Sequence, residues 1–387
     1  MDTQKLDQTY IANTYARFPV TIVKGKGSLV WDDTGKEYID LSTGIAVDIF
    51  GVADEEWMAA VTKQLGTLQH ISNLYYTEPC VKLAQMLCEK TGMKKVFFGN
   101  SGAEANECAI KAARKWSEEK KGKDYSTIIT LKNSFHGRTI TTLAATGQDV
   151  FHHDFTPLTE GFVYAEPNDL ADLEQLIKAN KCAAVMMEVV QGEGGVMPLD
   201  EAYVKGAAKL CEQYDLLLIC DEVQVGNGRS GKLYGYMHYG VQPDIVSTAK
   251  GLAGGLPLGA TLLGEKVQNV LSAGTHGSTF GGNPVCCAGA INVLSRLDEK
   301  MLEGVEERSA YIKQELTGAK GVLGVSGLGL MLGIQTEKNA SDIIAACREK
   351  GVLVIKAKDK LRLLPALNIP MEQLQKAVAV IKACCAE

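Results

Sequence analysis

The chain has 387 residues, 46% of them hydrophobic and 22% charged, and its formal net charge is −6 at pH 7. This length and composition predict a globular protein with a large core and two closely connected domains. The acidic balance argues against a nucleic-acid partner, because no basic stripe is present to neutralise phosphates. No apolar run approaches the ~18 residues that span a bilayer, so we expect no membrane partner either.

Targeting and cysteine patterns point to a reduced, cytoplasmic protein. The first residues lack a basic stretch followed by an apolar one, so we expect no secretion signal. Eleven cysteines occur without C-x-x-C spacing, and two pairs are adjacent, Cys286-Cys287 and Cys384-Cys385. This pattern favours free thiols over a disulfide framework or a zinc site, and we expect no metal centre.

Periodicity along the chain predicts an α/β protein in three stretches. Residues 20–41 alternate apolar and polar around two turns, which is typical of a small antiparallel sheet. From about residue 52 to 273, helical patterns alternate with short strands, which predicts a mostly parallel sheet between helices. The clearest of these strands are residues 128–131, 183–187 and 216–220.

The last stretch predicts a second, smaller domain. A long helical pattern follows Pro284 to about Leu316, strand-like pieces follow at residues 329–335, 352–355 and 361–364, and a helix covers residues 371–384. We therefore expect a large domain over residues 52–275 and a smaller α+β domain over residues 276–387. The N-terminal segment, residues 1–51, is expected to join the smaller domain.

Two of the apolar runs end in charged residues. Residues 216–220 lead into Asp221, and residues 244–249 lead into Lys250. Ligands of open α/β sheets bind beyond the carboxyl ends of the strands, so these side chains are placed for chemistry. A pyridoxal phosphate (PLP) enzyme needs an aspartate that holds a protonated pyridine nitrogen and a lysine that forms a Schiff base. The alternative is two solvated strand ends, since an acidic pair after an apolar run also occurs in nucleotide hydrolases.

An earlier strand end predicts a phosphate site. Residues 97–102 lead from an apolar pair through a Gly-Asn-Ser-Gly turn into an alanine-rich helix. The free N–H groups of the first helical turn bind anions, and the Ser101 hydroxyl can add a donor. The alternative for Ser101 is an ordinary N-cap. One face of the helix is expected to carry Ala109, Ala112, Ala113 and Trp116.

Residues 226–231 form a G-x-G-x-x-G sequence, which is also typical of a dinucleotide-binding fold. It does not follow a strand end directly, and residues 232–236 lack a clear amphipathic helix pattern, so this interpretation is disfavoured. No Walker A sequence occurs, which disfavours phosphoryl transfer.

These segments, in this order, resemble the class III (ω-amino acid) aminotransferases of the fold-type I PLP-dependent transferases over nearly the whole chain. The segments that carry the resemblance are residues 25–27, 31–32, 99–105, 135–139, 191–195, 221–224, 228–229, 243–244, 250 and 278–284. Within the family, residues 135–139 and the short length most resemble the members that act on acetylornithine in arginine biosynthesis. The resemblance implies transfer of the terminal amino group of N-acetylornithine to 2-oxoglutarate, giving N-acetylglutamate semialdehyde and glutamate.

The resemblance also implies roles in binding PLP. Lys250 and Asp221 would be catalytic, Phe135 would stack on the ring, and Gln224 would hydrogen-bond the ring hydroxyl. Thr279 would reach the phosphate of the neighbouring subunit, which implies a homodimer with shared active sites. The full implied cofactor set is Ser101, Gly102, Ala103, Phe135, Asp221, Gln224, Lys250 and Thr279.

Substrate selection rests on two arginines in this interpretation. Arg138 resembles the residue that holds the α-carboxylate of the acylated ornithine, and Arg362 the one that holds that of glutamate or 2-oxoglutarate; both would use the planar guanidinium fork. Glu193 would mask Arg362 while the amine donor is bound. Ser278 would lie near the substrate, and Tyr15 would gate it. The alternatives are surface ion pairs for the arginines and a core position for the tyrosine.

Three departures from the family pattern are visible. Residues 51–55 replace a common Gly-His-x-His-Pro, Glu188-Val189 replaces Glu-Pro, and Ser230 replaces threonine. The first lies in a stretch that relatives fold near the active-site entrance, so it affects substrate detail. Other ω-aminotransferases remain as alternatives, with ornithine, succinylornithine, succinyl-diaminopimelate or 4-aminobutyrate as substrate. A PLP aminomutase or decarboxylase and a PLP-sensing regulator are more distant ones.

Overall fold

The computed structural model describes residues 2–387 and is built around one seven-stranded sheet. Met1, with which the predicted N-terminal segment begins, lies outside the described residues. The strand order is β4-β12-β11-β10-β7-β5-β6, and only β12 is antiparallel to its neighbours among these strands. The strands are β4 (Lys95–Gly99), β5 (Thr127–Leu131), β6 (Phe162–Ala165), β7 (Cys182–Met187), β10 (Leu217–Asp221), β11 (Ile245–Thr248) and β12 (Gly259–Leu263). The predicted mostly parallel sheet is confirmed.

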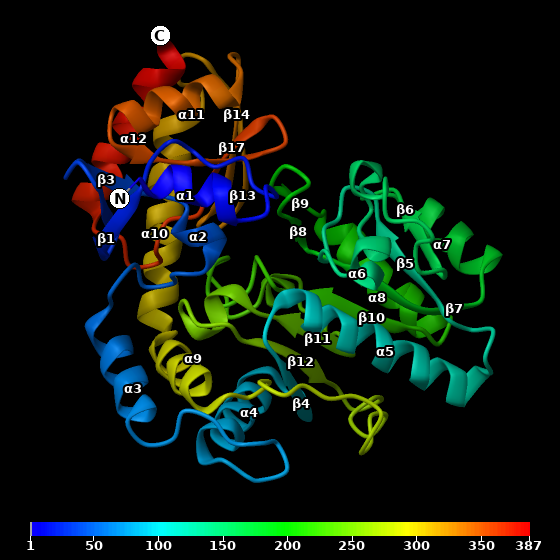
Figure 1. Cartoon of the computed structure of the whole chain (residues 1–387). Helices are drawn as coiled ribbons and strands as arrows, with labels where there is room; N and C mark the ends of the chain where they lie inside the picture. Colours follow the sequence, from blue (N-terminus) through cyan, green and yellow to red (C-terminus); the bar gives the residue numbers. More distant parts are fainter. Residues whose placement is uncertain (1) are drawn as a thin grey trace.

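Helices cover both faces of this sheet, so its central strands are apolar on both sides. Helix α5 (Gly102–Lys121) packs on one face with the predicted alanines and Trp116, all of them buried. Figure 1 shows α5 crossing in front of the sheet. The other face is covered by α4 (Glu78–Thr91), α7 (Leu170–Ala179), α8 (Glu201–Gln213) and α9 (Pro284–Arg296).

The smaller part of the molecule has two four-stranded sheets and its own apolar core. One sheet joins the N-terminal strands β1 (Ile22–Lys26), β2 (Leu29–Asp32) and β3 (Glu37–Asp40) to β15 (Val352–Leu353). The other contains β13 (Val322–Leu328), β14 (Met331–Thr336), β17 (Lys360–Leu363) and β16 (Ile355–Ala357). Parallel pairing of β3 with β15 brings the N-terminal segment to the C-terminal part, and both termini lie there in Figure 1. The domain boundaries after residues 51 and 275 stay a prediction.

Helices α10 (Glu299–Leu316), α11 (Ala340–Glu349) and α12 (Met371–Ala386) complete this part. The predicted continuous helix over residues 284–316 is wrong, because the chain breaks between α9 and α10. Asp298 begins α10 there as an N-cap whose side chain accepts the Met301 N–H. Strand β13, rich in glycine and half-exposed, is absent from the sequence prediction.

The remaining elements connect these parts. They are α1 (Thr3–Tyr10), α2 (Thr43–Ala46), α3 (Glu55–Leu65), α6 (Ile140–Ala145), the short pair β8 (Val190–Gln191) and β9 (Met197–Pro198), and three 3-10 turns, η1 (Asp149–Phe151), η2 (Gly235–His238) and η3 (Lys250–Ala253). Residues 226–231 lie in turns that lead to η2 and not to an α-helix, so they do not form a dinucleotide-binding unit.

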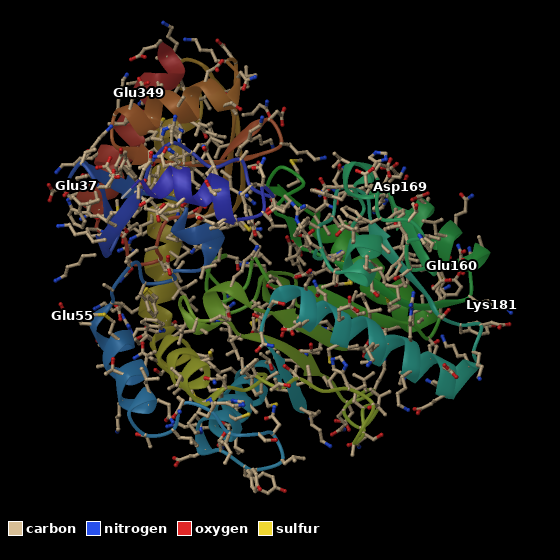
Figure 2. The ribbon with its side chains drawn as sticks, viewed as in Figure 1. Glu37, Glu55, Glu160, Asp169, Lys181 and Glu349 are labelled. Atoms are coloured by element: carbon tan, nitrogen blue, oxygen red, sulfur yellow. The ribbon has the colours of Figure 1, made fainter. Side chains whose placement is uncertain are left out.

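The charged side chains labelled in Figure 2 lie on the outside of the molecule, whereas others, among them Arg229 and Glu222, are fully buried. Across residues 2–387, all eleven cysteines are free, and the reduced state stays a prediction. Within the same range, none of the helices has the length and apolar character needed to cross a bilayer.

Candidate active site

The two predicted strand ends meet at one edge of the large sheet. Strands β10 and β11 are parallel neighbours, with Asp221 paired to Ser247. Lys250 follows β11 by two residues and opens η3. Both side chains line one cavity of about 280 Å³. Its lining comprises Gly102, Ala103, Asn106, Phe135, His136, Gly137, Arg138, Glu188, Asp221, Val223, Gln224 and Lys250.

Lys250 has an unusual backbone and an unusual amine. Its φ of +48° lies in the left-handed region, which costs energy for a residue with a side chain and is typical of functional positions. The side chain keeps some accessible surface, but protein surrounds the amino group closely enough that desolvation lowers the pKa to about 8. Glu193 opposes this shift, and Arg362 adds to it. An amine with this pKa is partly neutral near pH 7 and so is a competent nucleophile.

Asp221 is held by two side chains without a predicted role. Its Oδ2 accepts a hydrogen bond from Asn106 Nδ2 at 2.7 Å and lies 2.7 Å from His136 Nδ1. Its Oδ1 accepts the Val223 N–H at 3.0 Å. Asn106 Nδ2 also donates to the His136 carbonyl at 2.7 Å. All three side chains are buried, so the carboxylate is fixed toward the cavity.

Sequence reasoning missed His136 and Asn106, although signals for both were present. His136 lies inside the recognised segment of residues 135–139, and Asn106 is a polar residue on the alanine-rich face of α5. A buried polar side chain on an apolar helix face needs a partner, and here the partner is Asp221.

The N-terminus of α5 opens into the same cavity. Ser101 is its N-cap, and the Ser101 hydroxyl accepts the Glu104 N–H at 3.2 Å. Gly102 packs against Val223 so closely that an added Cβ would lie 2.6 Å from Val223 Cγ1. Gly102 and Ala103 line the cavity, so the first helical turn faces it. This is the geometry of an anion site.

Phe135 and Arg138 lie on the side of the cavity beyond β5. The Phe135 ring is partly buried and meets Phe151 edge-on at 5.7 Å. The exposed Arg138 guanidinium lies 4.7 Å from the Phe151 ring centre and 5.7 Å from that of Phe135. Its donors are free of an ion pair within residues 2–387, so they are available to a carboxylate.

A second arginine reaches the site from the smaller part of the molecule. Arg362, on β17, is 3% exposed, and its Nη1 donates to Glu193 Oε1 at 2.5 Å and to Gln224 Oε1 at 3.0 Å. Gln224 lines the cavity and also donates to Glu193 at 3.3 Å. Burial would raise the pKa of Glu193, but Arg362 and Lys250 outweigh it and hold the pKa below its usual value. Glu193 is therefore ionised at neutral pH.

Six predicted residues do not line the cavity. Ser101 precedes the lining residue Gly102, and Glu193 and Arg362 both hydrogen-bond the lining residue Gln224. The other three are Ser278, Thr279 and Tyr15. Ser278 is tied to Asn100, whose Nδ2 donates to Ser278 Oγ at 3.1 Å, close to the N-terminus of α5. Thr279 is exposed in the next loop position. Tyr15 is 68% exposed, and the Arg17 guanidinium lies 5.2 Å from its ring centre. A core position for Tyr15 is therefore wrong, and its gating role stays a prediction.

The residues around the cavity fit PLP. Four groups meet at one cavity: the Asp221 carboxylate fixed by Asn106 and His136, the partly neutral Lys250 amine, the Phe135 ring and the N-terminus of α5. These groups match a pyridinium nitrogen, an aldehyde carbon, a ring face and a phosphate.

Comparison with known proteins gives the class. Residues 10–385 match the family Aminotransferase class-III, and the chain belongs to this family of PLP-dependent transaminases. It is similar to acetylornithine aminotransferase of Haemophilus ducreyi, with 50% identity over 99% of this chain and 98% of that protein. Succinylornithine transaminase of Salmonella newport is 42% identical over 97% of this chain and 94% of its own length. A solved ornithine aminotransferase of Toxoplasma gondii, described with PLP at its active site, has a TM-score of 0.94 and 34% identity, covering 99% of this chain and 93% of that one.

Proposed function

We propose that this enzyme transfers the terminal amino group of N-acetylornithine to 2-oxoglutarate, giving N-acetylglutamate semialdehyde and glutamate. The likeness to the Haemophilus ducreyi enzyme supports this substrate. The product would serve arginine biosynthesis, and the predicted cytoplasmic location agrees with that role.

The observation that carries the proposal is the ion pair of buried Arg362 with partly buried Glu193 beside Gln224. The two half-reactions present the amine at different distances from the α-carboxylate, because one substrate reacts at its end and glutamate at its α-carbon. Arg362 can serve both half-reactions if Glu193 masks its guanidinium while N-acetylornithine is bound and releases it when glutamate is bound. Arg138, exposed and without an ion pair among residues 2–387, is free for the carboxylate of the acylated ornithine.

The other proposed roles follow the contacts around the cavity. Asp221 would hold the pyridine nitrogen, Phe135 the ring face, and Gln224 the ring hydroxyl. Ser101, Gly102 and Ala103 would bind the phosphate with the first turn of α5. When bound, PLP links to amines through its aldehyde carbon and withdraws electrons from the substrate carbon.

Lys250 would both hold the cofactor and move the proton. Desolvation keeps part of its amine neutral, so it can accept a proton at the substrate carbon and return it to the cofactor side. Glu193 lies near enough to raise the Lys250 pKa, so release of Glu193 from Arg362 would also alter the base.

We further propose a homodimer with shared sites. Thr279 is exposed on a loop outside the cavity of its own chain, while Ser278 is tied to Asn100 beside α5. The exposed side chain of Thr279 would thus be available to the phosphate of a second copy.

A donor panel tests the substrate. The purified enzyme is supplied with 2-oxoglutarate and, in turn, N-acetylornithine, succinylornithine, ornithine and 4-aminobutyrate, and glutamate formation is measured. The highest kcat/KM is expected for N-acetylornithine. A higher kcat/KM for ornithine or 4-aminobutyrate would contradict the assignment. Ornithine has a free α-amino group and 4-aminobutyrate lacks an α-carboxylate, and neither feature matches the proposed role of Arg138.

A further inference from the structure

Glu188 is a buried carboxylate that lines the cavity and that none of the roles proposed above uses. It follows the end of β7, is 5% exposed, and lines the cavity together with Asp221 and Lys250. A buried acid costs free energy unless hydrogen bonds satisfy it, so its partners reveal what it does.

Its two oxygens hold the backbones of two separate segments. Oε2 accepts the Phe135 N–H at 2.9 Å, and Oε1 accepts the Gly192 N–H at 3.2 Å. Within residues 2–387 it forms no ion pair with a lysine or arginine. Backbone hydrogen bonds therefore hold this side chain in place, and it holds those backbones in turn.

The two segments carry the groups proposed for the two half-reactions. Phe135 leads to Arg138, whose guanidinium lies over its ring. Gly192 precedes Glu193, the partner of Arg362. Gly192 lies tightly on Gln224, since an added Cβ would be 2.5 Å from Gln224 Oε1. A shift of either backbone would move one of the two carboxylate sites.

We propose that Glu188 is a positioning residue for both half-reactions: its carboxylate ties the Phe135 segment and the Gly192–Glu193 loop to the end of β7. Arg138 and Arg362 then keep their places around one cavity. This inference rests on the proposed function and deepens it, because one carboxylate links the two substrate-binding sides.

The charge of Glu188 should matter as well as its position. Burial raises its pKa to about 7, His136 opposes the shift, and Asp221 adds to it. Lys250 also faces it, and Glu188 raises the Lys250 pKa against burial. The ionised form accepts both backbone hydrogen bonds. Once protonated, one oxygen becomes a donor, so one contact weakens below about pH 7.

The experiment compares Glu188→Gln with a matched control, Glu222→Gln. Glu222 is also a fully buried acid that accepts two backbone hydrogen bonds, from Gly235 at 2.7 Å and Tyr236 at 2.8 Å, but it does not line the cavity. Glutamine keeps the side-chain size but presents an NH₂ group to one of the two backbone donors. The first readout is amide hydrogen exchange of the full-length, cofactor-free protein at pH 8.

Glu188→Gln should speed exchange at Phe135, Gly192 or both by about ten-fold, the effect of one lost hydrogen bond. The control should change exchange only around Gly235 and Tyr236. In the PLP-loaded enzyme, Glu188→Gln should lower kcat/KM in both half-reactions by a similar factor. Unchanged exchange at both amides, or a loss confined to one half-reaction, would overturn the inference.

The substrate assignment is tested separately in the same measurements. If the wild-type enzyme does not use N-acetylornithine, the proposed function fails. The role of Glu188 is then still decided by the amide exchange data. It is also decided by the two half-reactions, measured with glutamate and with the amine donor that the panel identifies.

Discussion

Replacement of Arg362 by alanine should separate the two half-reactions. Arg362 is 3% exposed, and its known contacts are Glu193 and Gln224, so in the proposed cycle its guanidinium is free for glutamate only after Glu193 leaves. Loss of a charge-assisted hydrogen bond costs about 1.5–3 kcal/mol, which is roughly ten- to a hundred-fold in rate. The half-reaction with glutamate should slow by this factor, while that with N-acetylornithine changes less.

Single-turnover absorbance of the bound cofactor reports each half-reaction by itself. Arg138→Ala is the mirror variant and should slow the half-reaction with N-acetylornithine more. Arg362→Lys is the matched control, because it keeps the charge but loses the planar fork, and its loss should lie between those of wild type and Arg362→Ala. Equal losses in both half-reactions for both alanine variants would refute the division of labour between the two arginines.

Three further results are expected. Borohydride reduction of the PLP-loaded enzyme should label Lys250 in a peptide map, and label on a different lysine would sink that assignment. Mixing inactive Lys250→Ala and Thr279→Trp subunits should restore some activity, because one hybrid site has both native residues; verified mixed dimers that stay inactive would contradict shared sites. In cofactor-free protein, burial lowers the pKa of Lys250 to about 8, below its usual value of 10.5. Its ammonium form therefore disfavours folding below pH 8, and the penalty fades as the pH rises from 8 toward 10.5. Lys250→Met should raise the free energy of unfolding at pH 7 by roughly 1–3 kcal/mol, with a gain that shrinks at higher pH in urea denaturation; a gain independent of pH would speak against a desolvated amine.

The departures from the family pattern acquire different meanings in the structure. Asp54, in the unusual stretch of residues 51–55, is the N-cap of α3 and forms an ion pair with Arg296 at 2.5 Å, so this stretch is held to α9. Glu188 lies in the second departure and lines the cavity. Ser230 is fully buried, and its hydroxyl and carbonyl lie within hydrogen-bond distance of His238.

Local patterns in the sequence were enough to place Asp221, Lys250 and the α5 N-terminus at the ends of their elements. Apolar runs bury themselves in a sheet whatever their neighbours are, and a charged residue that ends such a run must lie at the sheet edge. The serine cap and the alanine face of α5 were predictable for the same reason, since both depend on residues within one helix.

Contacts between distant segments were decided only by tertiary structure. The antiparallel direction of β12, the break at Asp298 and the pairing of β3 with β15 depend on which elements pack together. The same holds for the buried partners of the site. The hydrogen bonds of Asp221 with Asn106 and His136 join residues 115 and 85 positions apart, and that of Glu188 with the Phe135 backbone spans 53 positions. Sequence periodicity reports which face of an element is buried, but the identity of the group on the other side is set by the packing of the whole chain.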